Sequence, residues 1–314
     1  MATAKTSRAT FPGLTQSRVI VEGDAGTWDA DKVHTLSVVE AHREGYRYWG
    51  YYGLCYYGGD PILRKGGLIR SNDLIHWDKY EGNPIIGKDC RWPTAVLVDS
   101  TFHIFYAEYD RNNDSRIVML SSRDGKSFGR KKVVVPRELG KQNQNPFIFF
   151  NEQDKNYYLA YYHGIERSND KPLVGRLGIN KKTGKSKAKN VWQIKLLKSK
   201  TLSGLKDAKA RTLLTSRHTI ASPSITFFKG KYYLLVESIA EGKWDDKWVT
   251  LAYGSDKVSG KYRELSNNPL LPDNDACAFQ HVFDDELFIS YSHCIDLVNW
   301  KWEIRMVKST GSAT

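Results

Sequence analysis

The 314-residue sequence lacks long apolar runs and any recognisable leader. No stretch of 18 apolar residues occurs, which argues against a membrane-spanning helix. The N-terminal residues Met-Ala-Thr-Ala-Lys-Thr-Ser-Arg have no apolar core, so they do not resemble a signal peptide. Because a signal can be removed from a secreted protein, the compartment stays open between the cytoplasm and the outside of the cell. We expect no membrane partner.

Cysteine is also scarce. The four cysteines, at positions 55, 90, 277 and 294, are too few and too scattered for a disulfide framework. Cys277 and Cys294 are nearly symmetric about a turn at Asp284 and could face each other, but we expect buried free thiols. None of the four has a neighbouring Cys or His at the spacing of a zinc site.

Positive charge is abundant but local. Residues 181–211 hold ten lysines and one arginine against a single acid, Asp207, which accounts for +10 of the net charge of +12. Such a cluster could hold an anionic polysaccharide, a phosphate or a nucleic acid, or it could be a solvated excursion of one sheet. Aromatic residues that would stack on bases are nearly absent there, so we expect the excursion and no nucleic-acid partner.

One pattern is repeated five times, at roughly fifty-residue spacing. Two short runs rich in β-branched and aromatic residues are joined by a polar turn, as expected of a β-hairpin. The copies are 34–53, 89–110, 144–163, 221–238 and 275–293. Since one hairpin cannot bury both of its faces, repetition of this kind indicates a radial or stacked array.

Further strands complete each repeat. A third strand and a polar turn follow several copies, and Asn83–Ile86 and Asn268–Leu271 are candidates for fourth strands. Four-stranded antiparallel blades around a central funnel make a five-bladed β-propeller, an all-β fold, which we prefer to a β-sandwich. We expect a single domain, 1–314, with blades at about 28–86, 87–135, 142–200, 217–272 and 273–310, and the lysine-rich excursion at 181–211.

Propeller geometry predicts a site. The innermost strand of each blade starts at one face of the funnel, and the antiparallel strand beside it ends at that same face. Polar, ionisable and aromatic residues gather at these positions, as in a binding or catalytic pocket. The strand starts supply Asp31, His34, Asp89, Arg91, Trp92, Gln144, Asn145, Ser222, Asp275, Gln280 and His281, and the strand ends supply Tyr51, Tyr52, Glu108, Asp110, His163, Glu237 and His293.

Four stretches resemble the five-bladed β-propeller glycoside hydrolases: 221–238, Arg91–Val96, Asn145–Ile148 and Ser71–Trp77. That superfamily includes the family 43 arabinanases and xylosidases, the mannoside phosphorylases and the neoagarobiose hydrolases. The resemblance covers nearly the whole chain outside 181–211. It implies hydrolysis of a glycosidic bond and an oligosaccharide or polysaccharide, neutral or anionic, as the partner.

The sequence departs from family 43 at the catalytic positions. That family places an Asp before the Pro-Ser of blade one, an Asp before the Pro of blade three and a Glu two residues before the Pro of blade four. This chain has Thr35, Asn145 and Ala221 there, and none of them can serve as an acid or a base. Either the chemistry is lost, or the carboxylates lie elsewhere in the same funnel.

Four residues are candidates for acid and base. Asp31 is the candidate base, although it could equally be a turn residue. Asp89 would be kept ionised by Arg91 and would orient the base or bind hydroxyls, unless the two form a structural ion pair. Glu237 ends an apolar strand, where burial would raise its pKa and suit an acid.

His281 is the alternative acid, because the neoagarobiose-hydrolase-like members are thought to use a His, but it could also be a core or metal-bridging residue. Glu108 and Asp275 are held in reserve. We expect inversion, for which the two groups lie about 6.5 to 9.5 Å apart. No cofactor is required, and a structural Ca²⁺ on the funnel axis near His281 is compatible with the sequence.

The remaining candidates would bind the sugar. Trp92, Tyr51 and Tyr52 would form an apolar floor for a sugar ring. Hydrogen bonds to hydroxyls, or to a carboxylate or sulfate substituent, would come from the other polar candidates, which are His34, Arg91, Glu108, Asn145, His163, Asp275 and Gln280. Two alternatives to a hydrolase stay open: a glycoside phosphorylase, with Arg91, Arg217 and His218 as the phosphate cradle, and a propeller that binds glycans without cleaving them.

Overall fold

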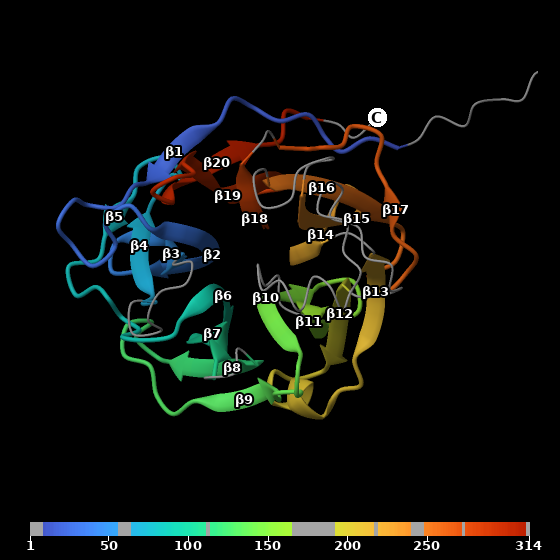
Figure 1. Ribbon diagram of the computed structural model, residues 1–314, viewed down its shortest axis with the longest axis horizontal. Coiled ribbons are helices and arrows are strands. Elements are labelled where there is room, and N and C mark those ends of the chain that lie inside the picture. The colour runs from blue at the N-terminus through green and yellow to red at the C-terminus, as the bar shows by residue number, and fades with distance from the viewer. Residues whose placement is uncertain are drawn as a thin grey trace, which may run out of the picture.

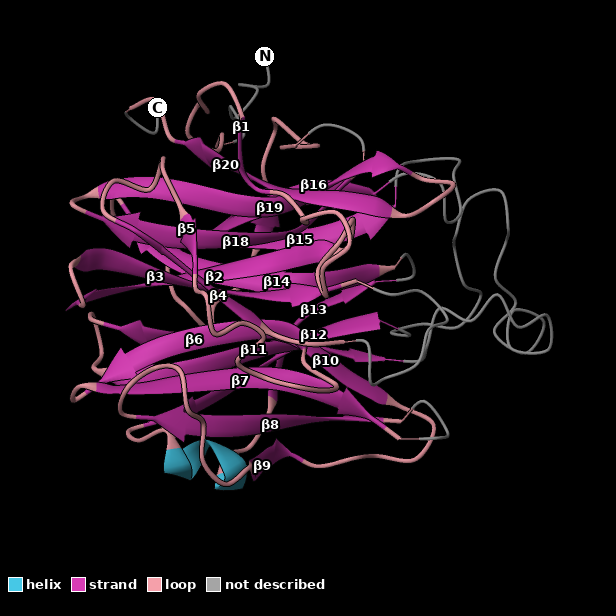
Figure 2. Cartoon of the chain, turned by 90° about the vertical axis from the view of Figure 1, so that its left-hand side faces the viewer, coloured by secondary structure: helices cyan, strands magenta, loops and turns pink. Residues whose placement is uncertain are grey.

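The computed structural model describes seven stretches of the chain, residues 9–55, 64–110, 114–164, 192–216, 219–239, 248–271 and 274–311. Five four-stranded antiparallel sheets surround a central axis (Figure 1). In the side view their strands run roughly along that axis (Figure 2). The predicted five-bladed propeller is therefore confirmed. No helix among the described residues is long and apolar enough to cross a membrane.

The strands follow the chain blade by blade, from the inside outward. Blade one comprises β2 (Val33–Arg43), β3 (Tyr46–Leu54), β4 (Gly67–Ser71) and β5 (Asp78–Lys79), and blade two comprises β6 (Arg91–Val98), β7 (Thr101–Tyr109), β8 (Ser115–Ser122) and β9 (Lys132–Val135). Blade three comprises β10 (Gln142–Asn151), β11 (Asn156–Gly164), β12 (Trp192–Ser199) and β13 (Arg211–Ser216), with the short 3-10 helix η2 (Ser203–Asp207) before β13. Blade four comprises β14 (Ile220–Phe228), β15 (Lys231–Ile239), β16 (Trp248–Ser255) and β17 (Arg263–Glu264).

Blade five joins the two ends of the chain. Its strands are β18 (Asp275–Phe283), β19 (Glu286–Asp296), β20 (Lys301–Lys308) and, on the outside, β1 (Arg18–Val21). The sequence-based boundary of 273–310 is corrected on this point, because an N-terminal strand completes the last blade. Pairing of β1 with β20 closes the ring and covers an otherwise exposed edge.

Three local expectations are also corrected. The fourth strands of blades one and four are β5 and β17, whereas Asn83–Ile86 and Asn268–Leu271 contribute only the isolated bridges at Ile86 and Leu271. Blade three extends to Ser216. The described part of the lysine-rich stretch is therefore sheet and 3-10 helix, and 181–191 lies outside the described residues. The four cysteines are free, as expected.

Aromatic side chains fill the spaces between blades. Trp49 of blade one stacks on Phe102 of blade two with ring centroids 5.1 Å apart, and both are fully buried. Nearer the axis, Phe147 of blade three meets the edge of Phe279 of blade five at 5.2 Å. Complete burial of one such side chain stabilises the fold by about 1.5–3 kcal/mol. The high aromatic content thus serves mainly to pack blades.

Each innermost strand carries a β-bulge near its start. The registers of β2, β6, β10, β14 and β18 with their neighbours shift there. In each bulge one non-glycine residue has a positive φ: Thr35 (58°), Trp92 (51°), Asn145 (50°), Ser222 (46°) and Cys277 (51°). A bulge re-aims side chains and interrupts the ladder. Because this conformation recurs in all five blades around one end of the axis, it distinguishes that end from the other.

Candidate active site

A pocket of about 170 Å³ lies at the end of the axis where the inner strands start, called here the pocket end. All five blades line it. Blade one contributes His34, blade two Trp92, blade three Asn145, blade four Glu237 and blade five Cys277. Ligand pockets commonly measure about 300–1,000 Å³. This one is compact, which suits a small number of sugar rings.

Glu237 is the one carboxylate among the described residues that line the pocket. It lies on β15 directly opposite Ala221 of β14, and it is 8% exposed. Its Oε2 accepts hydrogen bonds from Ser222 Oγ at 2.9 Å, from the backbone N–H of Cys277 at 3.3 Å and from Cys277 Sγ at 3.4 Å. The bulges of blades four and five therefore fix the position of this side chain.

Several buried polar atoms on the pocket wall are unpaired within the described part of the chain. They are Gln144 Oε1, Asn145 Oδ1, Thr219 Oγ1 and Trp302 Nε1. The amide nitrogen of Asn145, in contrast, donates to Ser222 Oγ at 2.9 Å. Buried polar groups almost always have partners, so these atoms indicate a bound polar molecule or water. They offer both acceptors and donors, which matches a polyol.

The blade-two side of the pocket is cationic. The Arg91 guanidinium lies 3.6 Å from the ring centre of Tyr109, and its Nε donates to Asp89 Oδ1 at 3.2 Å. Asp89 Oδ2 also accepts from the backbone N–H of Tyr109 at 3.0 Å. We expected Arg91 to keep Asp89 ionised. Instead, burial outweighs these interactions and raises the pKa of Asp89 to about 6.

Solved structures with the same architecture are numerous. A thermostable family-43 glycoside hydrolase is 16% identical with a TM-score of 0.62, covering 90% of this chain and 94% of its own. The endo-arabinase of Bacteroides thetaiotaomicron is 13% identical with a TM-score of 0.61, covering 94% and 98%. A β-xylosidase/α-arabinofuranosidase from a compost microbial metagenome, in complex with xylotriose, is 14% identical with a TM-score of 0.62, covering 96% of each chain.

The fold is that of the family-43 glycoside hydrolases. No protein-family model and no curated protein sequence matches the chain significantly. At these identities the likeness concerns the fold alone, so the site must be judged by its residues.

Six of the predicted site residues line the pocket, and they are His34, Arg91, Trp92, Gln144, Asn145 and Glu237. Burial lowers the pKa of His34 to about 3, so its imidazole is neutral, and its Nδ1 lies 2.8 Å from Thr35 Oγ1. Trp92 is tilted against Tyr109, with ring centroids 6.2 Å apart. Trp92 is half-buried, which leaves part of its surface for a ligand.

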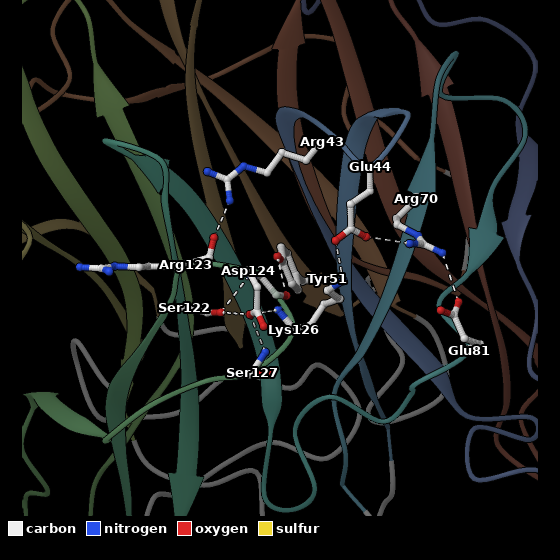
Figure 3. Close-up of polar contacts among 11 residues, drawn as sticks. Arg43, Glu44, Tyr51, Arg70, Glu81, Ser122, Arg123, Asp124, Lys126 and Ser127 are labelled. Atoms are coloured by element: carbon white, nitrogen blue, oxygen red, sulfur yellow. Dashed lines mark hydrogen bonds and ion pairs between the residues drawn. The ribbon is translucent and has the colours of Figure 1, made fainter.

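Asp31 and Tyr51 do not reach the pocket. Asp31 is exposed, and its Oδ2 lies 3.4 Å from Lys301 Nζ, so it is a surface residue and no base for this pocket. Tyr51 is buried between blades one and two, where its hydroxyl donates to the carbonyl of Gly125 at 3.0 Å. Figure 3 places Tyr51 beside the turn that contains Asp124. It packs the core and forms no sugar floor.

Tyr52 and Gln280 are likewise structural. The hydroxyl of Tyr52 donates to Asp29 Oδ2 at 2.8 Å. Gln280 Nε2 donates to the carbonyl oxygens of Ser224 and Tyr233, at 2.9 and 3.1 Å. The first bond ties β3 to the turn before β2, and the other two tie β18 to β14 and β15. Neither side chain lines the pocket.

His281 belongs to the opposite end of the axis. It lines a hollow formed where the inner strands end, and its Nε2 lies 3.0 Å from Ser290 Oγ. Burial lowers its pKa to about 3, which leaves a neutral imidazole. Its place on the inner strand, six residues beyond the strand start, removes it from the candidate acids of the pocket.

Three further candidates do not line the pocket and engage protein partners. Glu108 forms ion pairs with Arg116 and Lys131. His163 Nδ1 lies 2.7 Å from Asn143 Oδ1, and burial lowers its pKa to about 4. Asp275 is fully buried and its Oδ1 lies 2.7 Å from His293 Nδ1. They support the strand starts.

Sequence reasoning missed Arg64, Thr219, Trp248 and Trp302, which also line the pocket. The two tryptophans stand at or next to the starts of the third strands β16 and β20. A search of third-strand starts, in addition to first and second strands, would have found them. Arg64 precedes β4 and carries no such signal.

No metal site is evident in the described stretches, where His, Cys, Asp and Glu form no cluster of three or more that could hold an ion. A structural Ca²⁺ on the funnel axis near His281 stays a prediction. The proposed phosphate ligands Arg217 and His218 lie outside the described residues.

Proposed function

We propose that the protein is a glycoside hydrolase that cleaves a glycosidic bond of an oligosaccharide or polysaccharide in the pocket. The observation that carries this proposal is Glu237. Family 43 places its catalytic Glu at the position of Ala221, and Glu237 is the residue paired with Ala221 across β14 and β15. A carboxylate absent from the inner strand is thus supplied to the same pocket by the neighbouring strand.

The roles of acid and base follow from the two sides of the pocket. Glu237 donates a proton to the glycosidic oxygen. Asp89, which accepts a hydrogen bond from the pocket residue Arg91, takes a proton directly from a water molecule held beside that arginine, and the resulting hydroxide attacks the sugar. An inverting reaction separates acid and base by about 6.5 to 9.5 Å to leave room for that water. The unpaired pocket atoms bind sugar hydroxyls, and Trp92 offers a face for the ring.

The test is product release from a panel of neutral and anionic oligosaccharides and polysaccharides, with and without inorganic phosphate. We expect wild-type hydrolysis without phosphate, with release of the inverted anomer by NMR. Glu237→Gln and Asp89→Asn should each lose about 10²- to 10⁴-fold in kcat. Full activity in Glu237→Gln would overturn the assignment of Glu237.

A rescue sharpens the test. Because Ala221 and Glu237 face each other in register, moving the carboxylate from one to the other keeps it in the same part of the pocket. Glu237→Ala should be inactive, and the double variant Ala221→Glu/Glu237→Ala should regain part of the activity. A double variant that folds but stays as inactive as the single one would argue that Glu237 acts only through its present contacts.

A glycan-binding propeller without hydrolysis is the second candidate. It is favoured because Glu237 is the one carboxylate among the described residues that line the pocket, and because Ser222 and Cys277 already hydrogen-bond it. This alternative predicts sugar binding with no turnover across the whole panel. A phosphorylase would release a sugar phosphate, and only when phosphate is present.

A further inference from the structure

Positively charged side chains gather on the outer edge of blades two and three. Three cations lie at 130–132, where β9 begins, and five more lie at 198–211, between the end of β12 and the start of β13. One acid, Asp207, accompanies these eight cations. This surface, residues 130–132 and 198–211, is called here the basic edge.

The directions of the strands bring the two parts of the basic edge together. Neighbouring strands of a blade are antiparallel and the innermost strand starts at the pocket end, so the fourth strand starts at the opposite end. The fourth strands β9 and β13 start at Lys132 and Arg211. Between them lies η2, which contacts β9, β11 and β12, and Figure 2 shows this helix beside β9 at the margin of the molecule.

The basic edge is a packed part of the propeller. Leu205 of η2 is fully buried, and it shares a core cluster with Leu202, with Val134 of β9 and with Leu197 of β12. The backbone N–H of Gly204 also donates to Thr201 Oγ1 at 3.1 Å. Because packing fixes the backbone that carries the cations, a ligand can bind there without the entropic cost of ordering a loop.

Most cations of the basic edge form no ion pair. Two of them are paired with carboxylates, Lys198 with Asp154 at 2.8 Å and Lys131 with Glu108. Five others are exposed and have no ion-pair partner in the described part of the chain, and they are Arg130, Lys132, Lys200, Lys209 and Arg211. Their charges are therefore available to a partner molecule.

The chain nearby offers little counter-charge. Lys206 lies 4.0 Å from Asp207, but both side chains are largely exposed, and ion pairs of this kind contribute little. The adjoining residues 181–191, which lie outside the described residues, contain five lysines and no acid. A surplus of one sign on one surface raises the local concentration of oppositely charged molecules. The basic edge thus fits a polyanion.

Two features favour an acidic polysaccharide over a nucleic acid. Proteins that bind single strands stack the bases on aromatic side chains, and the basic edge contains no aromatic residue. The unpaired cations are spread along the edges of two blades and do not converge on one point, as expected for contact with an extended chain that carries repeated charges.

We propose that the basic edge docks a chain of an acidic polysaccharide and holds it against the outside of blades two and three. This surface is distinct from the pocket, which none of its residues lines. The choice of a saccharide as the polymer rests on the proposed function. The carboxylates or sulfates of the chain bind the exposed lysines and arginines, and its affinity falls as salt rises.

The experiment measures binding by titration calorimetry between about 50 and 200 mM NaCl. The probes are polygalacturonate, dextran sulfate, neutral dextran and a single-stranded oligonucleotide. We expect the two acidic polysaccharides to bind and neutral dextran not to bind. Lys209→Gln/Arg211→Gln should weaken their binding about 10- to 30-fold at the lowest salt. With dextran sulfate, the slope of log K against log salt should become shallower by about 1.5, since each cation on a densely charged polyanion adds about 0.7–0.9.

The matched control is Lys261→Gln/Arg263→Gln, which removes the same charge from exposed positions on the outside of blade four. It should bind every probe as the wild type does, and thermal unfolding checks that both double variants are folded. Equal weakening in the two variants would show attraction by net charge alone and would overturn the basic edge. Absence of binding to both acidic polysaccharides, or tighter binding of the oligonucleotide, would also overturn the proposal.

The two proposals fail in different ways. Hydrolysis of glycans without binding of either acidic polysaccharide at the basic edge would keep the hydrolase and remove the docking surface. Binding that is lost in Lys209→Gln/Arg211→Gln, with no turnover of any glycan, would keep the docking surface and remove the hydrolase. Glu237→Gln should bind dextran sulfate as tightly as the wild type, because Glu237 lies in the pocket.

Discussion

The two ends of the propeller axis are built from the same five inner strands, yet they differ in chemistry. At the pocket end every strand bulges, and Glu237, Arg91 and unpaired polar atoms gather around about 170 Å³. At the opposite end a hollow of about 470 Å³ is lined largely by aliphatic and aromatic side chains such as Phe149 and Phe227. The larger hollow is thus the weaker candidate. What marks a site is the convergence of unsatisfied polar groups, not the volume.

The largest effect should come from removing one of the two proposed catalytic carboxylates, Glu237 and Asp89. If Asp89 is the base, it must be ionised, so kcat/KM should rise with pH through about 6, where burial has moved the pKa of Asp89. Asp89→Asn should lose that limb and about 10²- to 10⁴-fold of the rate. His281→Gln, at the other end, should leave the pH–rate profile unchanged. Equal losses in both variants would erase the functional difference between the ends.

The middle of the axis should control stability and not activity. Phe279 is fully buried against Phe147 between the two ends, so Phe279→Ala should lower the free energy of unfolding by about 3–5 kcal/mol. Phe149→Ala, at the rim of the far hollow and only partly buried, should cost less than half as much. Urea denaturation measures both. A smaller cost for Phe279→Ala would mean that the centre repacks.

Two buried tryptophans, Trp302 and Trp49, differ in where their indole N–H donor lies. Trp302→Phe removes an indole N–H of the pocket that has no partner among the described residues, and sugar binding should weaken by about two- to tenfold, the net contribution of one hydrogen bond. Trp49 also has a buried N–H without a partner in the described part of the chain, but it lies in the core between blades one and two. Trp49→Phe should therefore leave binding unchanged. Titration calorimetry with one sugar suffices, and equal weakening in both variants would show that the effect is not local.

The smallest effect is on the pH dependence of stability. Burial lowers the pKa of His281 from 6.5 to about 3, so the unfolded chain binds the proton more readily, and stability is lost as pH falls from about 6.5 toward 3. His281→Gln should remove this pH-dependent loss of stability, which is on the order of 1 kcal/mol at pH 5. His34 acts with the same sign at the pocket end.

The titration of Asp89 changes stability in the opposite direction. Its pKa is raised, so its contribution to stability falls as pH rises from about 4 to about 6. At the pocket end, the titrations of His34 and Asp89 therefore change stability in opposite directions. At the far end, the titration of His281 acts. Thermal unfolding of wild type, His281→Gln and Asp89→Asn between pH 4 and 7 separates them. Parallel curves for all three would contradict these assignments.

The hairpins and the five blades were predictable because their signal is local. Alternating apolar residues around polar turns specify a strand pair within about twenty residues, and repetition specifies the array. The closing strand β1 was not predictable, since its partner β20 lies almost 300 residues away. The same distance dependence explains why the fourth strands, which are short and exposed, were misplaced.

The site was predictable only in part, for a geometric reason. The sequence alone was enough to place six residues at the pocket end, because their positions along the predicted strands determine the end at which they lie. These residues are His34, Arg91, Trp92, Gln144, Asn145 and Glu237. Which side chains point inward depends on the bulges, whose positive φ values no local pattern announced, and on the packing of neighbouring blades. Only the tertiary structure therefore sent Tyr51 into the core, His281 to the far end and Asp31 to the surface. It also brought Trp302, on the third strand of blade five, and Arg64, which precedes β4, to the pocket that Glu237 lines.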